Sequence, residues 1–245
     1  MTHGNVKDGN SIPEPICAVI MEIFFPFANA NPGRPFVVGQ LGQSLDGRIA
    51  TISGDAGDIG GVAGLKHLHS LRANVDAVVV GAATVLADDP RLNVRLVPGT
   101  SPARVVIDPQ GRIGNEGRWL APDGARRILI TTRDKAPGSC DEFIKLERRG
   151  SGFDPGDIVS ELFRRGMRRI LIEGGAMTLS RFLEAQCLDR LHVVVSPLII
   201  GSGKSSIELP PIASLSEAVR PETRVFILGG GEVLFDCDMR SGRNS

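Results

Sequence analysis

The chain has 245 residues, of which 28 are Lys or Arg and 28 are Asp or Glu, so its formal net charge is zero. A nucleic-acid-binding protein usually carries a basic excess, and the balanced charge disfavours that class. An anionic ligand would have to be held by a local group of residues rather than by the field of the whole protein.

The first feature along the chain is an apolar run at 16–27. With Ala28-Asn29-Ala30 after it, the run resembles the end of a signal peptide, but Glu22 interrupts it and acidic residues precede it. The run is also shorter than the roughly 20 residues that cross a bilayer. We therefore expect no membrane association. Residues 1–34 should form an extension whose apolar side chains pack on the domain or on a dimer partner.

From residue 35 onward, runs rich in β-branched residues alternate with segments of helical spacing. The runs predict strands at Phe36–Leu41, Asp76–Gly81, Arg104–Ile107, Arg127–Thr131, Arg169–Glu173, Leu191–Ser196, Val225–Leu228 and Glu232–Phe235. The intervening segments predict helices at Val62–Asn74, Ala82–Ala87, Asp154–Arg165 and Ala176–Gln186. This alternation indicates an α/β fold with a mostly parallel sheet and an antiparallel C-terminal edge. One domain over residues 35–240 is the simplest account.

A glycine-rich turn follows the predicted strand that ends at Glu173. Gly174 and Gly175 allow the backbone to come close to a ligand, and a helix begins directly after them. The N-terminus of that helix suits a phosphate, with the hydroxyls of Thr178 and Ser180 nearby. A tight turn without a ligand is the alternative. A carboxylate at the end of a buried strand, however, is more typical of a site than of a core.

A second polar segment follows the predicted strand that ends at Gly81. Thr84 falls in the first turn of the next helix, whereas Asp88 and Asp89 fall at its C-terminal end, where the helix dipole disfavours carboxylates. Residues placed against their local preference often serve a function. A solvated acidic pair in a loop is the alternative interpretation.

Three arginines stand where they could meet an anion. Arg72 closes a predicted helix and Arg95 closes the loop after Asp89, and a guanidinium group can bind phosphate in a bidentate way. Arg133 follows a predicted strand, at the position expected for a contact with the 2′-phosphate of NADP. Ordinary surface charge is the alternative for each of them.

Several familiar motifs are incomplete. The segment Gly201-Ser202-Gly203-Lys204-Ser205 looks like half of a P-loop, but Leu198 stands where that motif needs glycine. The HExxH and zinc-deaminase patterns are absent, and the four cysteines lack the spacing of a metal site or a disulfide framework. We therefore expect no metal, and a reducing cytoplasm as the location.

Taken in order, these segments resemble the reductase domain of riboflavin biosynthesis, of the RibD C-terminal type, within the dihydrofolate-reductase-like superfamily. The matching segments run in the family's order between about Pro35 and Phe235. They are Gln43–Ala50, Leu71–Ala73, Asp76–Gly81, Thr84-Val85, Asp88–Leu92, Arg95, Arg104–Asp108, Glu173–Gly175, Asp189–Leu191 and Pro197–Gly201.

The resemblance implies a three-layer α/β/α fold and an NADPH-dependent reductase. Its substrate would be a phosphorylated heterocycle, a 5-amino-6-(5-phosphoribosylamino)uracil-like pyrimidine that is reduced to its ribitylamino form. The cofactor would be contacted by Thr84, Asp88, Arg133, Gly174, Gly175, Ala176, Met177, Thr178, Leu179 and Ser180. The substrate would be contacted by Ser44, Arg72, Leu92, Arg95 and Glu173, with the arginines near its phosphate. Glu173 and Asp46 are the candidates for shaping the proton transfer.

Two other functions fit the same resemblance. A reductase of a pterin or another heterocycle would not need arginines for a phosphate, and a non-catalytic module would bind NADPH without turnover. Gln40 stands where many bacterial members carry Lys, a difference that bears on the substrate more than on the cofactor. Members of the family are commonly dimers, so we expect a homodimer through the C-terminal strands or the N-terminal run. The missing zinc motif predicts a reductase without the fused deaminase domain.

Overall fold

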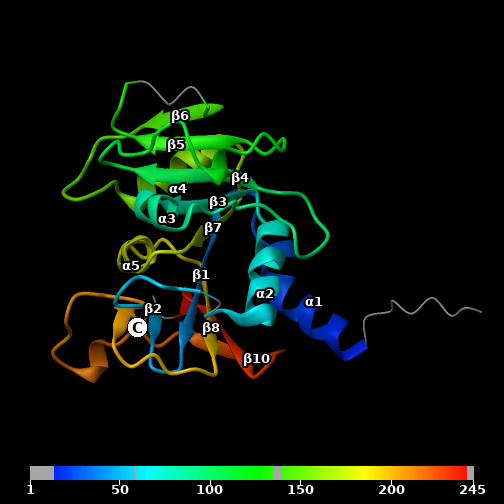
Figure 1. The fold of residues 1–245 in the computed structure, drawn as a ribbon. Coiled ribbons are helices and arrows are strands. Elements are labelled where there is room, and N and C mark those ends of the chain that lie inside the picture. Colours follow the sequence, from blue (N-terminus) through cyan, green and yellow to red (C-terminus); the bar gives the residue numbers. More distant parts are fainter. Residues whose placement is uncertain (1–13, 58, 135–138, 242–245) are drawn as a thin grey trace, which may run out of the picture.

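The computed structural model describes residues 14–57, 59–134 and 139–241, and one large twisted sheet runs through them (Figure 1). Its nine strands lie in the order β10-β11-β8-β1-β7-β3-β4-β5-β6. Their bounds are β1 Phe36–Ser44, β3 Ala77–Gly81, β4 Ala103–Asp108, β5 Arg127–Thr131, β6 Glu142–Lys145, β7 Arg169–Glu173, β8 Arg190–Ser196, β10 Glu222–Gly229 and β11 Glu232–Asp238. A separate small sheet pairs β2 (Arg48–Thr51) with β9 (Gly203–Ser205).

The strands from β8 to β6 run parallel to one another, and β11 and β10 add an antiparallel edge beside β8. The central strands are buried on both faces, which is why they read as unbroken apolar runs in the sequence. Because the parallel strands point the same way, their carboxyl ends meet at one edge of the sheet, where ligands bind in such folds. The expected α/β class and antiparallel C-terminal edge are confirmed.

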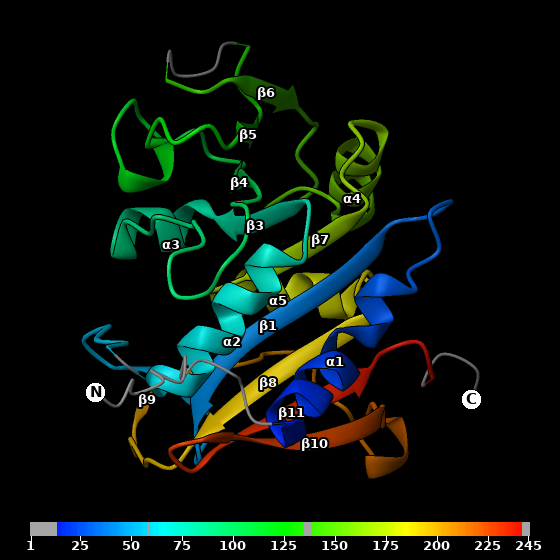
Figure 2. The same cartoon turned by 90° about the vertical axis from the view of Figure 1, so that its right-hand side faces the viewer.

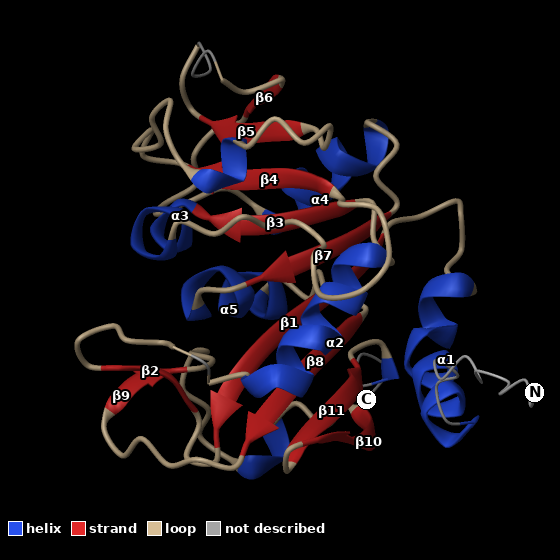
Figure 3. Ribbon diagram, turned by 45° about the vertical axis from the view of Figure 1, so that its right-hand side comes forward, coloured by secondary structure: helices blue, strands red, loops and turns tan. Residues whose placement is uncertain are grey.

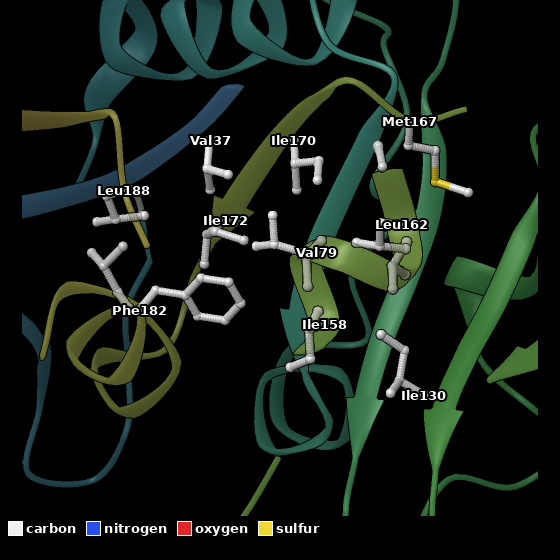
Figure 4. Packing of buried hydrophobic residues seen from close by; sticks show 14 of the residues in the cluster. Val37, Val79, Ile130, Ile158, Leu162, Met167, Ile170, Ile172, Phe182 and Leu188 are labelled. Carbon is white, nitrogen blue, oxygen red and sulfur yellow. The ribbon is translucent and has the colours of Figure 1, made fainter. Parts of the chain in front are cut away.

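Helices cover both faces of the sheet and give three layers (Figures 2 and 3). They are α1 Glu14–Ala28, α2 Gly61–Ala73, α3 Ala82–Asp88, α4 Pro155–Arg164 and α5 Ala176–Glu184. On one face, Ile158 and Leu162 of α4 and Phe182 of α5 pack against Val79 and Ile172 of the strands (Figure 4). On the other face, α2 and α3 pack their apolar side chains against the same strands. The sheet is thus enclosed along its centre, and its strand ends stay open.

The N-terminal apolar run forms α1, which lies across the antiparallel end of the sheet (Figure 2). Ile23 is 2% exposed and packs with Val194, Phe226 and Leu234, while Phe27 enters the larger core beside it. The described side chains of the run therefore include two that pack on the sheet, Ile23 and Phe27. Among the described residues, no helix is long and apolar enough to cross a membrane.

A buried polar chain anchors α2 to the sheet. Nε2 of His67 lies 3.0 Å from Nδ1 of His192, and Nε2 of His192 lies 3.1 Å from Oδ1 of Asp236. Arg190 and Arg224 pair with the same carboxylate at 2.6 and 2.8 Å. Burial, helped by the nearby His192, holds the pKa of His67 well below its usual value. Because His67 stays neutral, its burial places no unpaired charge in the core.

Candidate functional site

A cavity of about 660 Å³ lies at the carboxyl ends of β1 and β7. Its walls come from β1, β2 and the loop after it, α2, α3, the β7–α5 turn and β9. This volume is within the range of small-molecule sites, and the position is where an open α/β sheet binds its ligands. The charged side chains in the lining are Asp88, Glu173 and Lys204.

Glu173, at the end of β7, forms a bidentate ion pair with Arg72 from the last turn of α2. Nε and Nη2 of Arg72 donate to the two carboxylate oxygens at 2.7 Å each, and both residues are 5% exposed. Burial alone lowers the pKa of Arg72, but the charge and hydrogen bonds of Glu173 outweigh it and raise the pKa. Nη1 of Arg72 donates to the carbonyl of Asn93 at 3.0 Å. Arg72 is therefore occupied in holding Glu173 and this loop, and is poorly placed for the phosphate contact that the resemblance implies.

Gln40 lies beside Glu173 at the floor of the cavity. The two residues are register partners on the parallel strands β1 and β7. Val38 and Leu171 pack together under α2, and side chains two residues further along a strand share that face, so Gln40 and Glu173 project to the same side. Gln40 is 7% exposed and lines the cavity. This lining therefore carries an amide next to a fixed carboxylate.

The two turns singled out in the sequence meet at the side of this cavity. Gly174 and Gly175 have φ of 66° and 37°, in the left-handed region that favours glycine. A Cβ atom on Gly175 would lie 2.9 Å from Oγ1 of Thr84, which shows how closely the β7–α5 turn packs on α3. At the start of α5 the N–H of Thr178 donates to the carbonyl of Gly175, so the N–H groups of Ala176 and Met177 are the ones that an anionic ligand could take up.

A second cavity, of about 390 Å³, adjoins the first one beyond this turn. The two cavities share Ala83, Thr84, Gly175 and Met177. The charged side chains in the lining of the second cavity are Arg112 and Arg181, and no carboxylate from the described chain lines it. A cavity with two guanidinium groups and no acidic residue favours a ligand that carries phosphate. The site therefore has two adjoining compartments: the larger carries side chains of both charges, and the charged side chains of the smaller are both basic.

Ser44 and Asp46 shape the turn after β1, and neither is in the lining of the two cavities. Ser44 is fully buried, and its hydroxyl donates to Asp46 at 2.6 Å. The carboxylate of Asp46 also accepts from the backbone N–H groups of Ile200 and Gly201. The hydrogen bond from Ser44, with those from the backbone, lowers the pKa of Asp46 to about 2. Asp46 is thus a poor proton donor at neutral pH, and it ties the loop before β9 to β1.

Ser180 and Arg133 also lie outside both cavity linings. Ser180 is buried, and its hydroxyl accepts the N–H of Glu208 at 2.9 Å, so it fixes a loop on the far side of α5. Nη1 of Arg133 donates to the carbonyl of Ile113 at 3.2 Å. Both residues were predicted to contact the cofactor, and neither side chain lines one of the two cavities.

Leu92 and Arg95, predicted to face the substrate, follow α3 on the loop that Arg72 holds. Leu92 is 1% exposed and packs into the core, which attaches the loop to the domain. Arg95 is exposed, and its backbone N–H donates to Nδ1 of His69. Burial, with the charges of Arg72 and Arg95, lowers the pKa of His69 to about 4, so His69 is a neutral acceptor. The guanidinium group of Arg95 stays available to a ligand at the surface.

The remaining predicted residues do come together. Those lining the first cavity are Thr84, Asp88, Glu173, Gly174, Gly175, Ala176, Met177 and Leu179, and Thr178 lines the second. Sequence reasoning missed Lys204 and Arg112 as site residues. Lys204 lies in the segment set aside as an incomplete P-loop, and β9 brings it over the cavity. Arg112 follows the end of β4, a position that could have identified it because strand ends build such sites. Within the described residues, no group of three His, Cys, Asp or Glu is placed to hold a metal.

Comparison with known proteins gives a consistent result. The sequence profile of the RibD C-terminal domain matches residues 35–235. The chain is 32% identical over 222 residues to the riboflavin biosynthesis protein RibD of Aquifex aeolicus, spanning 87% of this chain and 60% of that protein. It is also 32% identical over 209 residues to the 2,5-diamino-6-ribosylamino-4(3H)-pyrimidinone 5′-phosphate reductase of Methanothermobacter thermautotrophicus, spanning 80% of this chain and 94% of that one.

A solved structure extends the likeness to the fold. The diaminohydroxyphosphoribosylaminopyrimidine deaminase/5-amino-6-(5-phosphoribosylamino)uracil reductase of Thermotoga maritima superposes with a TM-score of 0.71 at 29% identity. The match covers 89% of this chain and 59% of that one, so the chain spans about three fifths of the length of this protein and of the Aquifex one. The chain therefore belongs to the RibD C-terminal domain family of riboflavin-biosynthesis reductases.

Proposed function

We propose that the chain is an NADPH-dependent reductase that converts a phosphoribosylamino-pyrimidine to its ribitylamino form. The observation that carries the proposal is the two-compartment site, in which the cavity lined by Arg112 and Arg181 meets the cavity that carries Glu173 at the Gly174-Gly175 turn. The basic cavity suits phosphate groups of a dinucleotide, and the larger cavity has the volume of a small-molecule site that could take a heterocycle. The functions of the relatives from Methanothermobacter and Thermotoga support the same reaction class.

The residues present fit a phosphorylated nicotinamide cofactor. Thr84, the backbone from Gly174 to Thr178, and the arginines Arg112 and Arg181 would hold it, because each of them lines one or both of the adjoining cavities. The reaction adds a hydride to C1 of the ring-opened ribosyl group and a proton to the sugar, and NADPH supplies the hydride when bound. Selection of NADPH over NADH is expected, since no carboxylate from the described chain lines the basic cavity to meet a ribose diol.

The protein's own groups orient the substrate. Glu173, fixed by Arg72, accepts hydrogen bonds from the heterocycle and holds it in one orientation, which contributes to rate through positioning. The substrate phosphate would be met by Lys204, which lines the cavity, and by Arg95, which is exposed beyond it. The cytoplasmic location that the cysteine pattern indicates stays a prediction.

The test is oxidation of NADPH by the purified chain, followed by the loss of its absorbance. Substrates are the deaminated and non-deaminated phosphoribosylamino-pyrimidines, with dihydrofolate as the comparison. We expect turnover on at least one phosphoribosyl compound and none on dihydrofolate. Turnover on dihydrofolate alone would replace the proposal with a pterin reductase. Tight NADPH binding without turnover on any of the three would favour a non-catalytic module.

We also propose that the chain forms a homodimer through the antiparallel end of its sheet. α1 covers one face of β8, β11 and β10, whereas the other face carries a patch of partly or fully exposed apolar side chains. The patch consists of Val193, Val195, Val225, Ile227, Val233 and Phe235. A flat apolar face of this kind is typical of a subunit interface, and a second copy presents the same self-complementary surface.

Ile227→Asp tests the dimer, because Ile227 is 72% exposed at the centre of β10. We expect light scattering to give a dimer for the unchanged chain and a monomer for the variant. Leu215→Asp is the matched control, since Leu215 is 76% exposed but lies outside the patch. A monomeric unchanged chain, or a dimer that survives Ile227→Asp, would contradict this interface.

A further inference from the structure

We infer that Glu232 is a positioning residue for the reduction, because its carboxylate holds the first turn of α2 in place as a wall of the substrate cavity. The inference rests on the proposed reductase function, which places the pyrimidine in the larger of the two cavities. Glu232 is not itself in the lining of that cavity, so its effect on the substrate acts through α2.

α2 is a helix that depends on contacts outside itself. It has 13 residues, no side-chain cap at its N-terminus and no acidic residue in its first turn. Its residues include Gly61 and Gly64, and glycine weakens a helix relative to alanine. A helix of this length and composition is marginal on its own, so contacts with the sheet have to fix its position.

Glu232 supplies the missing cap from a distant part of the chain. It is the first residue of β11 and is 3% exposed, and its Oε2 accepts the N–H of Gly64 at 2.9 Å across 168 positions of sequence. A carboxylate beside the N-terminus of a helix is favoured by the helix dipole as well as by the hydrogen bond. Glu232 therefore stabilises the start of α2 in the way that a local capping residue would.

The glycines of α2 make room for this carboxylate. A Cβ atom on Gly61 would overlap Oε1 of Glu232, and a Cβ atom on Gly64 would lie 3.1 Å from Cγ1 of Val194. α2 thus approaches β8 and β11 more closely here than it could with side chains at these two positions. Gly64 and Val194 both line the substrate cavity, so Glu232 contacts a residue of the cavity wall.

The second oxygen of Glu232 indicates that stability alone does not account for the carboxylate. Oε1 is buried and has no hydrogen-bond partner among the residues that the structure describes. An unpaired buried acceptor costs free energy, and an apolar side chain at this position would avoid that cost. Residues that depart from such a rule are often kept for function, and the contact that Glu232 makes is with α2.

A displaced first turn of α2 would affect the substrate cavity and spare the basic one. α2 contributes Gly64, Leu65 and Leu68 to the larger cavity, whereas the second cavity is lined by other elements. His67 also ties α2 to the sheet through His192, so the helix stays attached when Glu232 is replaced. The expected effect of losing Glu232 is therefore a looser cavity wall in a protein that remains folded.

Glu232→Leu and Glu232→Gln test the inference, because glutamine keeps an acceptor for the Gly64 N–H and leucine does not. Losing a hydrogen bond to a charged group weakens an interaction by roughly 10- to 100-fold, so KM for the phosphoribosylamino-pyrimidine should rise at least about tenfold in Glu232→Leu. In Glu232→Gln, KM should stay within about threefold of the unchanged chain. kcat and the affinity for NADPH should change by less than about threefold in both variants, because the altered contact is remote from the cofactor compartment.

Leu162→Ala is the matched control for a general loss of stability. Leu162 is fully buried on α4, which packs on the other face of the sheet. This variant should be less stable, but its KM should change by no more than about twofold. An unchanged KM in Glu232→Leu, an equal rise in Leu162→Ala, or an equal rise in Glu232→Gln would each overturn the inference.

A measurement without substrate separates this inference from the proposed function. Hydrogen exchange followed by mass spectrometry reports how often backbone amides open. Glu232→Leu should speed exchange in residues 61–68 by about tenfold or more and leave α4 unchanged. Unchanged exchange in residues 61–68 would overturn the inference. Faster exchange, with no turnover of either phosphoribosyl compound by the unchanged chain, would contradict the proposed function and leave the contact between Glu232 and α2 established.

If Glu232→Leu fails to fold, Gly61→Ala displaces the same carboxylate from the side of the helix. Gly61 lines neither cavity, and its φ is 48°. Gly166→Ala is the control for backbone strain, because Gly166 has φ of 86° and open space around its Cα. KM should rise in Gly61→Ala and stay unchanged in Gly166→Ala, and equal KM values in the two variants would overturn the inference.

Discussion

Gly175→Val is expected to weaken NADPH binding by at least about 100-fold, which is roughly 2.7 kcal/mol. The backbone at Gly175 has φ of 37°, which a β-branched residue adopts only under strain. Its Cβ atom would lie 2.9 Å from Oγ1 of Thr84, so the larger valine side chain would have to displace Thr84, which lines both cavities. Fluorescence titration or calorimetry with NADPH measures the loss.

The matched control is Gly166→Val, which imposes a similar backbone strain away from the site. Gly166 has φ of 86° after the end of α4, and a Cβ atom there would meet nothing within 4 Å. Both variants should lose about 1–2 kcal/mol of unfolding free energy, but only Gly175→Val should lose cofactor affinity. An unchanged NADPH affinity in Gly175→Val would refute the assignment of this turn to the cofactor phosphates.

The central sheet could be predicted from the sequence because its strands are buried on both faces. Runs such as Ala77–Val80 and Ile170–Ile172 have no polar interruption and end at turn residues. The sequence therefore predicted that these strands exist and where they begin and end. β6 and β9 were missed for the opposite reason. β6 is a four-residue edge strand in which only Ile144 is buried, and β9 has three polar or glycine residues, so neither carries a periodic pattern.

The site was predictable where function and chain geometry coincide, at the ends of parallel strands. Thr84 and Gly175 lie on separate turns of the chain. Because the carboxyl ends of parallel strands meet at one edge of the sheet, the sequence predicted that both turns would contribute to one site. Pairing between distant side chains was not legible. Arg72 and Glu173 are 101 positions apart, and neither segment of the sequence indicates that the two side chains would form an ion pair. The hydrogen bonds of Asp46 could not be predicted for the same reason, since its backbone partners come from the loop before β9.

Arg72→Met is expected to lower the free energy of unfolding by about 3–5 kcal/mol. The substitution keeps most of the apolar stem but leaves the carboxylate of Glu173 buried without its partner, and it removes the hydrogen bond to the Asn93 carbonyl. Arg95→Met is the control, because Arg95 is an exposed arginine on the adjoining loop. It should change stability by no more than about 0.5 kcal/mol. Urea denaturation of both variants measures the difference.

The double variant Arg72→Met with Glu173→Leu separates the structural role of the pair from its role in the site. Removing both partners leaves no unpaired buried charge, so most of the lost stability should return. kcat/KM for the pyrimidine substrate should not return, because the acceptors on the cavity floor are gone, while NADPH affinity should stay within about threefold of the unchanged chain. Recovery of both stability and kcat/KM would mean that Glu173 serves only the fold. Recovery of stability alone would establish that this buried ion pair is maintained, at a cost in desolvation, to hold a carboxylate in place for the substrate.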